Sequence, residues 1–331
     1  MLQLRRVLHP TDFSDGARAA FAHALHLARA HGAALDVMHV APLLGFLPVG
    51  AGIDVAAYPS GYEGAYVEAQ EESLHAYVRA AGTVGVDVRV VPTVVGGPVA
   101  REILDHARAA GADLIVMGTN GRSGLGRFVM GSIAEAVVRE ALCPVLTVQA
   151  RPEGAERPTD VRRIAAAVDF NYFAEDLVRH ADALAACYPG ASVALVHVVD
   201  SMMNLGVAKL GFEQRGRALA SLEAGAWQQL EALRLRVARP ATPFSYHVSS
   251  GFAPDEVLAA IERMDPDIVV TASRGPRGIM ERMLLGSVTE RILRGGHRAT
   301  LVVKPAGRPV AVADEPDAAG ANPDAPALVG A

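Results

Sequence analysis

A glycine spacing in the first half of the chain is suited to holding phosphate groups. Gly118 and Gly121 are followed, after nine residues, by Gly131-Ser132. Glycine lets backbone N–H groups approach an anion without a Cβ in the way, and a helix beginning near Ser132 offers unpaired N–H donors at the positive end of its dipole. The Ser132 hydroxyl can cap that helix or bond a phosphate oxygen. The alternative is a strand-to-helix turn that needs glycine only for its backbone.

The elements on either side of this spacing favour the phosphate interpretation. The apolar run 113–117 predicts a buried strand that ends at Met117, and a helical pattern begins at Ile133. Arg122 and Arg127 lie between the glycines, where they either neutralise phosphate or point into solvent. A strand, a glycine-bearing loop and a helix start therefore follow one another in the order that an anion site requires.

Composition excludes several classes of protein. The formal charge of −5 gives no reason to expect nucleic acid or an anionic membrane as a partner. Two cysteines, Cys143 and Cys187, exclude a disulfide framework and fit a reducing compartment, and neither lies at a metal-ligand spacing. The first residues lead into an ordinary strand rather than a signal peptide, and no stretch is long enough to span a bilayer. We expect a cytoplasmic protein.

The sequence contains an internal duplication with an offset of about 155 residues. Several segments recur in the same order: 6–14 as 163–171, His39-Val40 as His197-Val198, 113–117 as 267–271, and Gly131-Ser132 as Gly286-Ser287. The two histidines flank a buried strand, and we interpret them as satisfied core residues rather than ligands. The repeat predicts two domains of one fold.

Each copy alternates short apolar strands with amphipathic helices. In the first copy the strands are expected near 4–9, 35–41, 86–94, 113–117 and 144–149. This alternation predicts an α/β fold of two tandem doubly wound domains, each with a five-stranded, mostly parallel sheet flanked by helices on both faces. Such sheets bind ligands beyond the carboxyl ends of their strands. Asp12, Val40 and Gly118 all fall at strand ends and are expected to converge there.

The expected domain boundaries follow from the repeat and from two stretches without periodicity. The first domain covers 1–150, a polar linker covers 151–160, the second domain covers 161–305, and 306–331 is an Ala/Pro/Asp/Gly tail expected to be disordered. Within the first domain, 42–64 is rich in Gly, Pro and Tyr and precedes a helix expected near 65–81. A segment of that length at a ligand-binding edge is a candidate lid or partner surface.

These motifs resemble the universal stress protein family. The resemblance rests on Pro10-Thr11-Asp12-Phe13-Ser14, on the glycine spacing that ends at Gly131-Ser132, and on Cys143-Pro144 before the closing strand. It covers about residues 2–305 and is similar to the tandem-domain form of the family. The family's ATP-binding branch carries the same glycine spacing, so the resemblance implies that the first copy binds ATP, with or without Mg²⁺.

The resemblance also implies a role for individual residues. Asp12 would accept a hydrogen bond from the adenine end of the nucleotide, although it can also simply cap the following helix. The backbone of Val40 would bond the base, although Val40 can also be plain core. The implied nucleotide-binding set is Pro10, Thr11, Asp12, Val40, Met117, Gly118, Gly121, Arg122, Gly131, Ser132 and Ile133.

The second copy departs from this pattern. Ala272 stands at the position that Gly118 holds in the first copy. Ten residues, rather than nine, separate Gly275 from Gly286, and Pro276 removes a backbone N–H donor. The corresponding residues form a degenerate second site: Asp169, Gly275, Gly286 and Ser287. We expect this copy not to bind ATP in the same way and to serve mainly as a packing partner.

Three functions remain open. The favoured one is an ATP-binding stress-response regulator or sensor whose nucleotide alters its association with other, unidentified proteins. The second is a slow ATPase or nucleotide hydrolase using the same pocket, and the third is an interaction scaffold without nucleotide. There is no P-loop lysine, dinucleotide fingerprint or nucleophile elbow, and no acidic pair lies beside the glycines.

We expect the two copies to pair edge to edge as an intrachain pseudo-dimer, and a homodimer of whole chains stays open.

Overall fold

The computed structural model describes nine stretches of the chain: 4–42, 62–95, 98–119, 130–149, 160–200, 212–239, 241–273, 285–295 and 298–304. Most of the expected linker and the whole expected tail lie outside the described residues. The structure places Pro42 in a strand and begins the next helix at Tyr62, so the segment expected at 42–64 is shorter at both ends, and 43–61 lie outside the described residues.

The first half of the chain alternates strands and helices as the apolar pattern predicts. Its elements are β1 (Arg6–Pro10), α1 (Asp15–His31), β2 (Ala34–Pro42), α2 (Tyr62–Ala80), β3 (Val88–Val95), α3 (Val99–Ala110), β4 (Leu114–Gly118), α4 (Ser132–Glu140) and β5 (Val145–Val148).

The second half repeats this order. Its elements are β6 (Arg163–Ala167), α5 (Ala174–Ala185), β7 (Ser192–Asp200), α7 (Phe212–Val237), β8 (Phe244–Gly251), α8 (Ala253–Met264), β9 (Ile268–Ala272), α9 (Ser287–Gly295) and β10 (Ala299–Val303).

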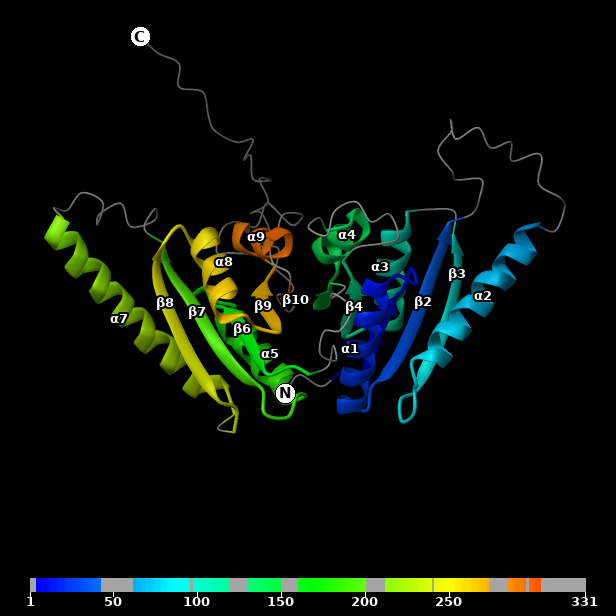
Figure 1. Ribbon diagram of the computed structural model, residues 1–331, viewed down its shortest axis with the longest axis horizontal. Coiled ribbons are helices and arrows are strands. Elements are labelled where there is room, and N and C mark those ends of the chain that lie inside the picture. The colour runs from blue at the N-terminus through cyan, green and yellow to red at the C-terminus, as the bar shows by residue number, and fades with distance from the viewer. Residues whose placement is uncertain are drawn as a thin grey trace, which may run out of the picture.

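The ten strands form one continuous sheet in the order β3-β2-β1-β4-β5-β10-β9-β6-β7-β8. Among the described strands, the β5–β10 pair is antiparallel and every other neighbouring pair is parallel. The closing strands of the two halves therefore meet edge to edge, as the repeat predicts. In Figure 1 the halves spread to either side of this central pair, with α2 and α7 at the two outer ends.

Helices cover both faces of the sheet because its strands are apolar on both faces. On one face α1, α2, α5 and α7 share a core that runs through both halves and includes Phe21, Leu74, Leu177 and Leu230. On the other face α3 and α4 pack on the first half, and α8 and α9 pack on the second. This is the doubly wound arrangement expected from the sequence.

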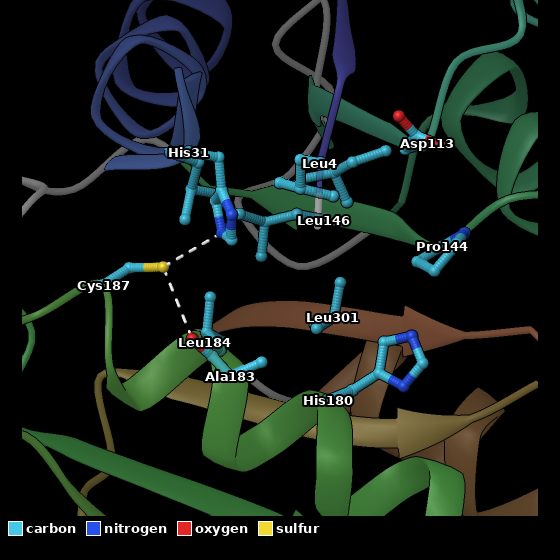
Figure 2. Close-up of a pocket in the computed structure, with 12 residues that line it drawn as sticks. Leu4, His31, Asp113, Pro144, Leu146, His180, Ala183, Leu184, Cys187 and Leu301 are labelled. Carbon is cyan, nitrogen blue, oxygen red and sulfur yellow. Dashed lines mark hydrogen bonds between the residues drawn. The ribbon is translucent and has the colours of Figure 1, made fainter. Parts of the chain in front are cut away.

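The last turns of α1 contact the second half just after α5. The His23 Nδ1 and Tyr188 Oη atoms lie 3.1 Å apart, and His26 Nε2 donates to the Cys187 carbonyl at 2.7 Å. The Cys187 Sγ and His31 Nε2 atoms lie 3.3 Å apart (Figure 2). An apolar cavity of about 20 Å³ lies beside them, which is room for about one water and not for a nucleotide.

A buried charge cluster lies at the amino ends of the first strands. The Asp36 carboxylate is fully buried and accepts from Arg6 Nη1 at 2.9 Å, from Arg89 Nη2 at 2.9 Å and from His106 Nε2 at 3.2 Å. The equivalent strand position in the second half is Ala194, which pairs with Ser245 where Asp36 pairs with Arg89. The second half therefore lacks the buried carboxylate at the equivalent place in its sheet.

Candidate functional site

The turn after β1 begins the candidate site. Asp12 Oδ1 accepts from the Ser14 N–H at 3.1 Å and from Ser14 Oγ at 2.6 Å. Ser14 is the N-cap of α1, and its Oγ accepts from the Ala17 N–H at 3.2 Å. Ser14, and not Asp12, therefore caps α1, and Asp12 supports that cap only by accepting from Ser14; the ligand role of Asp12 stays a prediction.

Phe13 gives this turn its unusual backbone. Its φ is +66°, a conformation that costs energy for a residue with a Cβ. The Phe13 N–H donates to Thr11 Oγ1 at 3.0 Å, and its ring packs against the ring of His39 with centroids 4.4 Å apart. His39 Nδ1 in turn donates to the Thr11 carbonyl at 2.7 Å, so this histidine is satisfied, as expected.

Gly118 lets the end of β4 approach the start of α1. A Cβ added at Gly118 would lie 2.9 Å from Ala17 N and 2.9 Å from the Gly16 carbonyl carbon, both of them backbone atoms. Real Cβ atoms do not approach backbone so closely. Glycine at this position is therefore required by packing, whatever binds beyond it.

Gly131 and Ser132 form the start of α4. Gly131 is the N-cap, its N–H donates to the Thr119 carbonyl at 2.8 Å, and none of the described side chains caps the helix. A Cβ at Gly131 would lie 3.1 Å from that carbonyl oxygen. Because Ser132 is the first helical residue, the positive end of α4 faces the carboxyl end of β4 with its first N–H groups available to an anion.

The sheet order brings most of the predicted residues to one edge. β1 lies between β2 and β4, so the carboxyl ends that carry Asp12, Val40 and Gly118 are neighbours. The side chains of Pro10, Thr11, Val40 and Met117 are buried. Ile133 is exposed. Gly121, Arg122 and Arg127 lie outside the described residues.

His9 and Tyr77 lie beneath this edge and were not predicted from the sequence. His9 is fully buried, its Nδ1 donates to the Val116 carbonyl at 2.8 Å, and its Nε2 lies 3.1 Å from Tyr77 Oη. Burial lowers the pKa of His9 to about 4 and raises the pKa of Tyr77 to about 12. The one signal in the sequence is a histidine inside an otherwise apolar strand.

We expect His9 to make the protein sensitive to acid. Its pKa is about 4 when folded and about 6.5 when unfolded, so the unfolded chain binds more protons between these values. The stability that neutral His9 contributes is fully present above about pH 6.5 and is lost as the pH falls toward 4. His9 alone should lower the free energy of unfolding by about 2 kcal/mol between pH 8 and pH 5, as measured by urea titrations.

The control is His9→Asn, whose amide nitrogen can replace the Nδ1 donor but does not titrate. Its free energy of unfolding should fall less steeply between pH 8 and pH 5 than that of the wild type. Equal slopes in the two proteins would contradict the assignment to His9.

The second half repeats part of this geometry. The Gly286 N–H donates to the Ser273 carbonyl at 3.1 Å, as Gly131 does to Thr119, and Ser287 begins α9. Ala272 stands in place of Gly118, and α5 begins at Ala174, two residues later than α1 begins in the first half. Ala272 carries a methyl group at the position where the first half has none.

Two further predicted residues of the second half have different outcomes. Asp169 follows β6, and burial raises the pKa of its carboxyl group, so it is a weaker candidate for an ionised ligand. His197 Nδ1 donates to the Val168 carbonyl at 2.9 Å, which makes it a satisfied core histidine as expected. Gly275 lies outside the described residues.

Neither a metal centre nor a membrane span is found in the described part of the chain. No three His, Cys, Asp or Glu side chains gather there in a way that could hold a metal ion. None of the described helices combines the length and the apolar character that crossing a membrane requires.

Comparison with known proteins identifies the family. The model of the universal stress protein family matches residues 3–149 and again residues 160–304. A universal stress protein of Methanocaldococcus jannaschii is 35% identical over 44% of this chain and 82% of its own length. One of Mycolicibacterium smegmatis is 27% identical over 90% of this chain and 97% of its own.

A solved structure extends the likeness to the whole fold. The crystal structure of a universal stress protein from Archaeoglobus fulgidus covers 92% of this chain and 97% of its own, with a TM-score of 0.59 at 21% sequence identity. The two family matches, the full-length relative and the repeated α/β fold agree. This chain belongs to the universal stress protein family, and it carries two copies of the family's domain in tandem.

Proposed function

We propose that the first half of this protein binds ATP, with or without Mg²⁺, and that the protein acts in the cytoplasm as a nucleotide-dependent regulator or sensor of stress. The observation that carries the proposal is the uncapped start of α4 beside the glycine end of β4. It supplies backbone donors and a positive dipole without a side chain in the way.

The rest of the edge fits the other end of a nucleotide. The Asp12 carboxylate lies after β1, next to the strand that carries Gly118, and can accept from the base or the ribose. The buried side chains of Val40 and Met117 leave main-chain groups to recognise the base. Sequence and geometry thus provide an acceptor at one end and N–H donors at the other.

The second half is proposed as a packing partner with a weaker or different anion preference. It keeps the Ser273–Gly286 hydrogen bond and the start of α9. It has Ala272 at the position of Gly118, the glycine that lets the start of α1 approach the end of β4. Burial also disfavours the ionised form of Asp169.

The first experiment identifies nucleotide released from the denatured full-length protein by chromatography and measures its ratio to chain. About one ATP per chain supports the proposal, and two would overturn the assignment of the second half. Absence of nucleotide, together with no increase in Tm when ATP is added, would overturn the proposal itself.

A matched pair of variants locates the site. Asp12→Asn keeps the oxygen that accepts from Ser14 and removes the charge, so we expect ATP to bind about tenfold more weakly with little change in Tm. Asp169→Asn makes the same change in the second half and should leave the Kd unchanged. Titration calorimetry of both variants measures this difference, and equal losses of affinity would contradict the assignment.

A further inference from the structure

A chain of hydrogen bonds runs from the candidate site into the core of the first half. Tyr77 of α2 is buried, and its Oη lies 3.1 Å from Nε2 of His9, whose Nδ1 donates to the Val116 carbonyl. Thr11 Oγ1 accepts from the Phe13 N–H at 3.0 Å. The Tyr77 ring also contacts the ring of Phe13, so this side chain links α2 both to β1 and to the turn that carries Asp12.

The bond from His9 to the Val116 carbonyl determines which atom donates in the bond between His9 and Tyr77. A carbonyl oxygen only accepts, so the bond to Val116 requires the proton of neutral His9 on Nδ1. His9 Nε2 is then the acceptor, and Tyr77 must donate to it.

Tyr77 also contacts the strained turn at Phe13. Phe13 holds its left-handed backbone while its N–H is bonded to Thr11 and its ring lies against Tyr77 with centroids 5.6 Å apart. The ring of Tyr77 also stacks on Phe21, with centroids 5.0 Å apart. One side chain of α2 therefore packs against the turn and is itself held by a hydrogen bond to His9 beneath it.

The second half has no equivalent chain among its described residues. Ala166 and Val168 stand at the positions of His9 and Thr11, and the apolar Leu233 is among the buried residues of α7. Phe170 contacts His197 as Phe13 contacts His39, yet it does not adopt a positive φ. The hydrogen-bond chain and the strained turn occur together, in the half with the complete glycine motif.

We propose that Tyr77 is a positioning residue for nucleotide binding, holding the Thr11–Phe13 turn so that Asp12 faces the ligand. Through it the packing of α2, the helix that follows residues 43–61, is coupled to nucleotide affinity. This inference rests on the proposed function, and its test is arranged so that the two can fail separately.

The test compares two buried tyrosines in the full-length protein. Tyr77→Phe removes a tyrosine–histidine hydrogen bond of 3.1 Å beneath the site, and Tyr188→Phe removes one of the same length between the halves. Both variants should lower Tm by a similar few degrees. In titration calorimetry with ATP, Tyr77→Phe should weaken binding about fivefold to tenfold, and Tyr188→Phe should leave the Kd unchanged.

A second variant tests whether the chain acts as a unit. Thr11→Val introduces the residue found at position 168 and removes the Oγ1 that accepts from the Phe13 N–H in the turn that Tyr77 contacts. It should weaken ATP binding, and the double variant Tyr77→Phe/Thr11→Val should lose less affinity than the sum of the two single losses.

Each outcome decides one of the two proposals. A wild-type protein that binds ATP while Tyr77→Phe binds equally well would overturn the positioning role, as would equal losses in Tyr77→Phe and Tyr188→Phe. Fully additive losses in the double variant would also overturn it. A wild-type protein that binds no ATP would overturn the proposed function before the variants are compared.

Discussion

Replacing Gly118 by valine is expected to abolish ATP binding and to lower the free energy of unfolding by about 3 kcal/mol. The first added carbon would meet the backbone of Gly16 and Ala17 at 2.9 Å. Backbone atoms at a helix start cannot rotate away as a side chain can, so α1 must shift and carry the Asp12 turn with it. Urea unfolding and calorimetric titration with ATP measure the two effects.

Ala272→Val is the matched control in the second half. Position 272 already carries a methyl group, and α5 begins two residues later than α1 does, so we expect a smaller loss of stability and no change in ATP affinity. A Gly118→Val variant that binds ATP like the wild type would contradict the role given to this glycine.

Asp36→Ala is expected to cost about 3 kcal/mol or more in the free energy of unfolding. The buried carboxylate is the common partner of two arginines and a histidine. Its removal leaves the two arginines near one another without the carboxylate that both contact. Because the cluster lies at the amino ends of the strands, ATP affinity at the carboxyl ends should not change. Chemical denaturation and calorimetry together check both statements.

The second half suggests the control for this loss. It carries Ala194 and Ser245 where the first half carries Asp36 and Arg89, and Ala260 at the position of His106. The triple variant Asp36→Ala/Arg89→Ser/His106→Ala removes the unpaired charges as well and should recover part of the lost stability. A triple variant less stable than Asp36→Ala would show that the charges are not the cause.

The fold could be predicted from the sequence because buried parallel strands leave a simple record. Each is a short apolar run followed by an amphipathic helix, and runs such as 114–118 and 268–272 appear at corresponding places in both halves. The duplication strengthened the prediction, since a strand seen twice is less open to chance. The edge-to-edge pairing of β5 and β10 followed from the same argument.

The candidate site was only partly predictable. The glycines could be identified because they serve the backbone, and backbone requirements are local in sequence. The link from Tyr77 to His9 and Phe13 could not, because it spans more than sixty residues and depends on how α2 lies on the sheet. Burial of the Val40 and Met117 side chains likewise depends on helices from elsewhere in the chain.

The contact between α1 and the turn after α5 has a consequence for symmetry. In a dimer of identical subunits, each residue of such a contact would occur on both sides of the axis. Here His26 donates to the Cys187 carbonyl, whereas the position in α5 that corresponds to His26 is Ala183, which has no side-chain donor to return the bond. The two halves are free to differ, so a protein that docks across the seam meets two unlike sides and can bind in one orientation rather than two.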